Sequence, residues 1–277
     1  MNWLRDTWLV FRQGFQALLR SKATWLMVAF AMVYVLVLAV SLRRMGDSMD
    51  QNRLFTGVTL TLFIMVIIPL VATYFGVASV RDEISQGTIL HLLVRPVPRS
   101  AIWTGKYLAA WFVSLLLLSL TFGLSLLVAQ TMAPQAGFGR AFVLSRHLPF
   151  LQALIHGPLV YSAVGLFFGL RFRWSMVWAV AFILIWEEFV SVTPSGSGAR
   201  TLTISDSMRT LIYHAAHEGS RLRAVLTRVE IGPRRQSIEV PGASSARFTL
   251  ACFWFLSLAL ANWAGARREF LSAEKET

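Results

Sequence analysis

Six runs of apolar residues, each close to the length of a membrane crossing, constrain this 277-residue chain more than any other feature. A helix needs roughly 20 apolar residues to cross about 30 Å of hydrocarbon. Hydrophobic residues make up 56% of the sequence and charged residues only 14%, which is too apolar for one soluble core. The predicted fold class is therefore all-α integral membrane, a single domain over 1–277. The six predicted spans are 24–42, 56–80, 107–132, 149–170, 174–192 and 248–266.

Local features refine these spans. Arg43 and Arg44 follow the first run, and no small-residue cleavage site accompanies it, so we expect the run to stay as a span and not to be removed as a signal peptide. The fourth run contains Gly165 and Gly169, a small-residue pattern that lets helices approach closely, within the chain or between two copies. Because Cys252 is the single cysteine, no intramolecular disulfide forms.

The N-terminal segment 1–22 predicts an amphipathic helix lying in the membrane interface. Its apolar residues recur at spacings of four and three, with arginines and glutamines on the other faces. Arg20 and Lys22 are placed to face anionic lipid headgroups. Membrane lipids are therefore expected partners. The apolar stripe consists of Leu4, Trp8, Phe11, Phe15 and Leu18.

The net charge of +12 is explained by membrane orientation and not by nucleic acid, because the basic residues are spread over loops without clustered stacking aromatics. With the N-terminus inside, the short cytoplasmic segments carry 13 Lys and Arg residues and the two short outer loops carry five. The other eight lie in 193–247, and long loops translocate largely regardless of charge. We expect a multi-pass protein of a bacterial inner (plasma) membrane, with both termini cytoplasmic.

The polar segment 81–106, between the second and third spans, predicts a short cytoplasmic coupling helix. Gly87 and Thr88 break one helix and cap the next, whose apolar residues in 89–93 recur at helical spacing. The two prolines of "RPVPR" end it after about two turns. A stiffly held amphipathic helix of this kind suits docking into a groove on a cytoplasmic partner.

The stretch "RDEISQGTILHLLVRPVPRSAIWTGKYLA" resembles the signature between the second and third spans of ABC-2 type transporter permeases. That signature combines an acidic residue, Gly-Thr, Leu-Leu, a proline followed by Arg, and a Lys at the start of the next span. With six spans and a long loop before the last, the resemblance covers essentially the whole chain. The matching residues are Glu83, Gly87, Thr88, Leu92, Leu93, Pro96, Arg99 and Lys106.

The resemblance implies the membrane subunit of an ATP-driven transporter, an exporter or an envelope-acting system. It implies a dimer with a second copy or a paralogue, and separate cytoplasmic ABC ATPase subunits that the signature residues contact. The residues support this separation, because the chain has no G-x-x-x-x-G-K-[ST] loop and "TGKY" lacks its upstream Gly and its Ser or Thr. We therefore expect no cofactor on this chain, with ATP and Mg on the partner, and no enzyme activity of its own.

An acidic pair lies near the outer end of the fifth predicted span, in "FILIWEEF". Trp186 and Glu187 resemble the aromatic "WE" end of this span in one branch of the ABC-2 permeases, whereas Glu188 stands where an apolar residue is more usual. A charge at the bilayer centre costs about 2.5 to 3.5 kcal/mol on insertion scales, so an uncompensated pair facing lipid is disfavoured. Two readings remain open for these three residues: an outer gate or substrate path, and a structural ion pair or early span end.

The segment 193–247 predicts a helical outer loop, because apolar residues recur at helical spacing from Met208 to Leu226. His214 and His217 share one face of this helix with Glu218 beside them, but no third ligand is evident and we predict no metal site. Those histidines and the acidic pair are the only support for an alternative, an intramembrane enzyme. A non-transporting membrane scaffold is a further alternative. The predicted coupling helix argues against both, since neither needs it.

Overall fold

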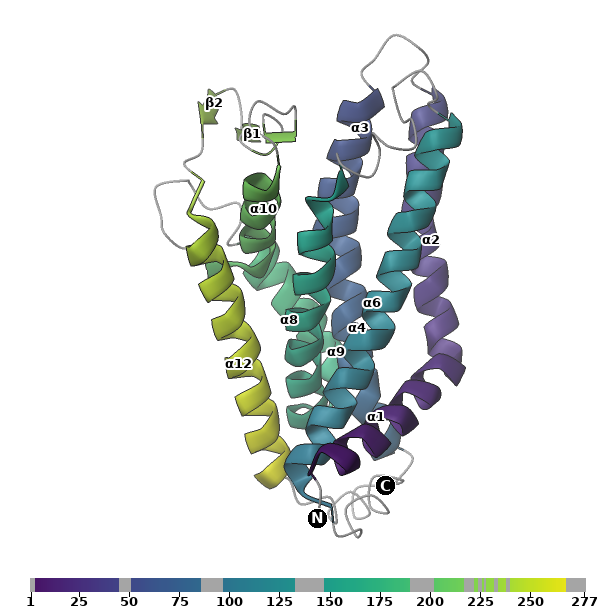
Figure 1. Ribbon diagram of the computed structural model, residues 1–277, viewed down its shortest axis with the longest axis vertical. Helices are drawn as coiled ribbons and strands as arrows, with labels where there is room; N and C mark the ends of the chain where they lie inside the picture. The colour runs from purple at the N-terminus through teal and green to yellow at the C-terminus, as the bar shows by residue number, and fades with distance from the viewer. Residues whose placement is uncertain are drawn as a thin grey trace.

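The computed structural model describes ten stretches of the chain. Figure 1 shows a bundle of long helices with a diagonal helix, α1, across one end. The described stretches are 3–44, 51–85, 97–132, 147–189, 202–216, 222–223, 226, 228–231, 234–237 and 240–267. Their elements are α1 (Trp3–Arg20), α2 (Lys22–Arg44), α3 (Gln51–Val58), the π-helix η2 (Thr59–Ile67), α4 (Ile68–Ser85), α6 (Arg99–Met132), α8 (Phe150–Arg171), α9 (Ser175–Phe182), the π-helix η4 (Ile183–Phe189), α10 (Ile204–Ala215), β1 (Arg228–Ile231), β2 (Arg234–Ser237) and α12 (Ala243–Arg267).

Five helices are long and apolar enough to cross a membrane, and they correspond to five of the six predicted spans. The second of these, Arg53–Ile84, runs without a break through α3, η2 and α4. The other four are α2, α6, α8 and α12.

The fifth predicted span, 174–192, is described only in part. Residues Ser175–Glu187 form a shorter apolar helix within α9 and its continuation η4, and the residues after Phe189 lie outside the described part of the chain. The described residues therefore support five long spans, and the sixth stays a prediction.

α8 is the central helix of the bundle, and its closest neighbour is α4. Two glycines of α8 allow this approach: a Cβ added at Gly165 would collide with the backbone of Thr73, and one at Gly169 would lie 3.1 Å from the carbonyl oxygen of Val77. Gly76 of α4 lies opposite them, since a Cβ added at Gly76 would lie 2.9 Å from the Cα of Gly165. The small-residue pattern predicted from the sequence thus serves packing within the chain.

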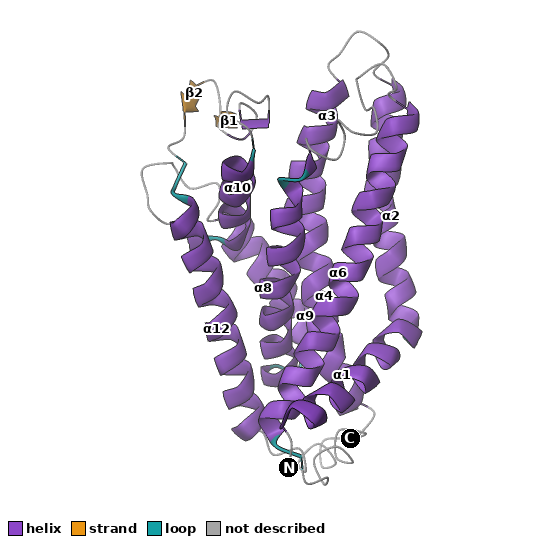
Figure 2. Cartoon of the chain, viewed as in Figure 1, coloured by secondary structure: helices purple, strands orange, loops and turns teal. Residues whose placement is uncertain are grey.

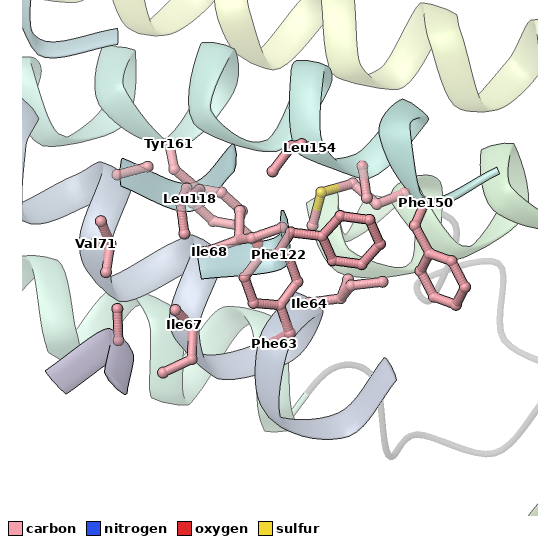
Figure 3. Close-up of a cluster of buried hydrophobic side chains, with 14 of the residues drawn as sticks. Phe63, Ile64, Ile67, Ile68, Val71, Leu118, Phe122, Phe150, Leu154 and Tyr161 are labelled. Carbon is pink, nitrogen blue, oxygen red and sulfur yellow. The ribbon is translucent and has the colours of Figure 1, made fainter. Parts of the chain in front are cut away.

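Aromatic and aliphatic side chains of η2, α4, α6 and α8 form the main apolar cluster (Figure 3). The ring of Phe63 stacks on Phe122 with centroids 5.6 Å apart, and Phe122 lies 6.0 Å from Phe150. Three helices therefore meet through one chain of rings. Such offset ring contacts add to the hydrophobic burial.

α2 and α12 lie on opposite flanks of the bundle (Figure 1), and their outward faces are apolar. Trp25, Leu26 and Leu36 of α2 are more than 60% exposed, as are Phe248 and Phe255 of α12. Exposed apolar surface on this scale is expected where lipid replaces water.

α1 packs across the first turns of α6 through small residues. Its protein-facing side consists of Thr7, Val10, Gly14 and Leu18, whereas Leu4 and Trp8 of the predicted apolar stripe are exposed. A Cβ added at Gly105 of α6 would lie 2.8 Å from the Cβ of Val10. The helix therefore turns one face to α6 and leaves Leu4 and Trp8 outward, as a membrane-interface helix requires, while Phe11 and Phe15 contact Phe112 of α6.

Within its described residues, the segment 193–247 is partly helical and partly β-stranded. Its described part contains α10, which packs against α8 and α12, and an antiparallel hairpin of β1 and β2 with Arg228 opposite Ser237 (Figure 2). The hairpin was not predicted. The β-branched residues Val229 and Ile231 occupy alternate positions of β1, as is typical of strands. Two such residues are too few for the alternation to be recognised in the sequence.

We predict that Gly165→Ala destabilises the protein, whereas Gly123→Ala does not. The added methyl at position 165 meets the backbone of Thr73, which has no room to move, but the one at position 123 meets nothing within 4 Å. We expect a loss of about 2 kcal/mol or more for the first and a change of less than about 1 kcal/mol for the second. Thermal unfolding in detergent, monitored by size-exclusion chromatography, measures the stability of both variants. Equal melting temperatures for the two variants would contradict the close α4–α8 contact.

Candidate functional site

Four helix ends meet at one end of the bundle, which we call the base: the start of α1, the end of α4, the start of α6 and the end of α12 (Figure 1). The segment 86–96 joins α4 to α6 at this end. The described residues of the ABC-2 signature, Glu83, Arg99 and Lys106, all lie here.

Glu83 and Lys106 form an ion pair that ties α4 to α6. The Lys106 Nζ lies 2.5 Å from the Glu83 Oε1 and also donates a hydrogen bond to the carbonyl oxygen of Ser79 at 3.2 Å. The Lys106 side chain is 1% exposed and that of Glu83 19%. A lysine this deeply buried is tolerated only with a paired anion and further acceptors, so the two helix ends are held together.

Arg99 ties the start of α6 to the end of α12. Its Nη1 donates to the carbonyl oxygen of Ala266 at 2.7 Å, one of the last carbonyls of α12 that have no partner within the helix. A cation at a helix C-terminus is also favoured by the helix dipole. Beside this contact, the ring of Trp103 lies against Gly265, where an added Cβ would collide with it.

α1 joins the same cluster at the first two turns of α6. The indole nitrogen of Trp3 donates to the Ser100 hydroxyl at 3.3 Å, and Val10 packs on Gly105. α6 thus contacts α1, α4 and α12 within its first eight residues, Arg99 to Lys106. The other signature residues, Gly87, Thr88, Leu92, Leu93 and Pro96, lie outside the described residues.

The candidate outer-gate residues lie away from the base, at the junction of η4 and α10. Glu187 is 1% exposed, and each of its carboxylate oxygens accepts one backbone hydrogen bond, from Ile204 N at 3.1 Å and from Ser205 N at 2.8 Å. The hydroxyls of Ser205 and Tyr161 also contact this carboxylate. The first turn of α10 therefore compensates the buried charge of Glu187.

Trp186 and Glu188 are less closely defined. The indole nitrogen of Trp186 is buried and has no hydrogen-bond partner in the part of the chain that the structure describes. Glu188 lies in η4, and its side chain is outside the described part. Of these three residues, Glu187 is the one that the described side chains place in a defined polar site.

His214 and its neighbours contribute to packing of the α10 region. Its Nε2 hydrogen-bonds with the carbonyl oxygen of Pro241 at 2.8 Å, and Arg223 donates to the carbonyl oxygen of Tyr213 while lying over the Tyr213 ring. His217 and Glu218 lie outside the described residues. Within the described ranges, no three His, Cys, Asp or Glu side chains gather in a way that would hold a metal ion.

Sequence reasoning missed the small and hydroxyl residues that complete both sites. Gly105 and Gly265 admit Val10 and Trp103 at the base, and Ser205 and Tyr161 surround Glu187. Glycine is common in membrane helices, and a serine 18 residues after a glutamate carries no local signal. Only the spatial arrangement identifies them.

We predict that Glu83→Gln and Lys106→Met each destabilise the protein more than the double variant does. Each single change leaves one charge without its partner, which costs about 3 to 5 kcal/mol at a buried site, and removing both charges relieves that cost. A double-mutant cycle of thermal stability in detergent measures the coupling. Additive losses in the double variant would show that the two groups do not pair.

One comparison with known families found a match. A family model described as ABC-2 family transporter protein matches residues 12–189, which run from within α1 to the end of η4 and include Glu83, Arg99, Lys106 and Glu187. No curated protein matches the chain. The matched part is well over half of the 277 residues. The chain therefore belongs to the ABC-2 family of transporter membrane proteins.

Proposed function

We propose that this chain is the permease subunit of an ATP-driven ABC transporter and that separate cytoplasmic ATPase subunits dock at the base. The observation that carries the proposal is the placement of Glu83, Arg99 and Lys106 at one end of the bundle, on both sides of segment 86–96. Membership of the ABC-2 family supports the class of partner. ATP and Mg would then be held by the partner, which supplies hydrolysis.

The contacts at the base support transmission of movement from the docking segment. Displacement of segment 86–96 acts on the end of α4 and on the start of α6, because the segment joins these two helices. The Glu83–Lys106 pair couples the two helix ends to each other, and the movement reaches α12 through Arg99 and α1 through Gly105. A cluster of paired charges and close backbone contacts resists deformation, so the helix ends shift together and do not absorb the movement separately.

The proposed orientation places the base in the cytoplasm and α10 with the hairpin outside, in a bacterial inner (plasma) membrane. The basic residues of α1 and of the end of α12 support this, since Arg5, Arg12, Arg20 and Arg267 all lie on base helices. Two permease copies, or this chain and a paralogue, would complete the assembly with two ATPase subunits. We propose an export or envelope-acting role from the resemblance to ABC-2 permeases and not from any one residue.

We predict that replacing Leu92 and Leu93 together by Asp releases the ATPase and leaves the permease in the membrane. Two carboxylates in an apolar docking face cannot be desolvated without a partner. Co-purification of an affinity-tagged permease with its ABC ATPase measures the effect. Leu148→Asp is the matched control, because Leu148 is 48% exposed at the opposite end, before α8. If the double variant retains as much ATPase as the control, segment 86–96 is not the docking site.

A second prediction concerns orientation. In a Cys252→Ala background, Ser197→Cys should react with a membrane-impermeant maleimide added to intact cells, whereas Ser100→Cys at the base should react only after lysis. Cys252 is removed because it is exposed. Both residues are chosen in polar segments so that the change itself is mild. The reverse pattern of labelling would invert the proposed topology.

A further inference from the structure

α10 starts deep in the bundle and not at its surface. The Tyr161 hydroxyl lies 3.1 Å from the Ser205 hydroxyl, and Tyr161 stands near the middle of α8, ten residues before its last residue, Arg171. Met208, one turn further along α10, lies above Gly157 and Ile68, where a Cβ added at Gly157 would be 2.9 Å from the Met208 sulfur. Ile68 is the first residue of α4, halfway along the second long span. The first turn of α10 is therefore level with the middle of the neighbouring spans.

The described end of the fifth helix and the start of α10 meet inside the bundle. η4 is described as far as Phe189, and the 12 residues of α10 rise about 18 Å from the meeting point. The two pieces meet where Glu187 accepts hydrogen bonds from Ile204 and Ser205. Discontinuous helices with polar ends at mid-membrane depth are a device that transporters use where movement is needed.

Glu187 is the contact that holds the two pieces together. Its two oxygens satisfy two of the first amide donors of α10, and the Thr203 hydroxyl accepts a third hydrogen bond, from Asp206 N at 3.3 Å. Separation of η4 from α10 would leave both a buried carboxylate and two buried N–H groups without partners. Such a contact is either fully made or fully broken, because half-satisfied buried polar groups are costly.

α10 also touches the second place where the helical backbone is distorted. Arg209 reaches the Met65 sulfur, at 3.3 Å, and Met65 lies in the π-helix η2. α10 thus contacts a π-helical segment of the second long span and the π-helical end of the fifth. π-helical segments are frequent at functional sites, where they mark backbone that can change register.

We infer that α10 is a movable half-helix that closes the bundle at its far end, and that Glu187 is the latch that seats it. The latch consists of the Glu187 carboxylate and the amides of Ile204 and Ser205. In the resting state it holds α10 between α8 and α12. In the transport cycle its opening lets α10 move away from Gly157 and Tyr161, so that the interior becomes accessible from that side. The role in transport rests on the proposed function, whereas the seating of α10 does not.

Labelling of α10 by a water-soluble maleimide in the isolated permease tests whether Glu187 holds α10 in place. Thr210→Cys in a Cys252→Ala background places a thiol at a buried position of α10, and Ser244→Cys at the exposed start of α12 is the positive control for probe access. We expect Glu187→Gln to raise the rate of maleimide labelling at position 210 about tenfold. The substituted side chain has an amide nitrogen in place of one carboxylate oxygen, so a hydrogen-bond donor would face a backbone N–H of α10, which is also a donor. Labelling at 244 should stay constant. An unchanged rate at 210 in a folded Glu187→Gln protein overturns the latch.

A second pair of variants tests the latch from its backbone side and without changing Glu187. Ile204→Pro removes one of the two donors, and proline is well accepted there because position 204 is the first of the helix and Thr203 has an extended backbone, with φ −85° and ψ 145°. Ile204→Ala keeps the donor and removes more apolar volume than proline does. We expect Ile204→Pro to expose position 210 more than Ile204→Ala does. Equal or greater labelling in Ile204→Ala would show that apolar packing, and not the latch, seats α10.

Labelling during ATP turnover distinguishes a failure of the latch from a failure of the proposed function. With the ATPase bound in reconstituted vesicles, ATP should raise labelling of Thr210→Cys while Glu187 is intact, and an ATPase-inactive partner should not. Transport that proceeds without any increase in labelling overturns the movement of α10. Failure of any ATPase to bind would instead count against the proposed function, and the two comparisons in the isolated permease would still decide the seat.

Discussion

The backbone contact between α4 and α8 is the constraint on which the rest of the bundle depends. Gly76, Gly165 and Gly169 bring the two helices so close that a single methyl group has no space at Gly165. In a membrane, where lipid is as apolar as leucine, such close packing replaces the hydrophobic drive that a soluble core would use. The pair forms a rigid centre, and α6, α10 and α12 pack around it.

Charged side chains join helices of the described bundle at two levels. At the base, Lys106 and Arg99 join the helix ends where a cytoplasmic partner would act. Near mid-depth, Glu187 joins η4 to the start of α10. Buried charges cost free energy in lipid, so each is retained where it fixes the position of one helix relative to another.

The sequence predicted the long spans and the residues of the base but not how those residues interact. Apolar runs of adequate length and the order of the 81–106 signature are local patterns, so they were read without a structure. The partners of Glu187 could not be predicted in this way, because the amides at 204 and 205 lie 17 and 18 positions away and a contact over that separation leaves no periodic trace. The two readings of the acidic pair, a gate and a structural contact, do not exclude each other. A gate at this place would open by breaking the contact between Glu187 and α10.

The central claim is that the base is where the ATPase acts, and the most direct measurement is site-specific cross-linking. A photo-reactive amino acid replaces Ser100, which is exposed at the start of α6, and a second preparation carries it at Leu148, which is exposed at the other end. Membranes containing permease and ATPase are irradiated, and the cross-linked partner is identified by mass spectrometry. We expect capture of the ATPase at position 100 and not at 148. Capture at 148, or at neither position while the complex still co-purifies, would contradict it.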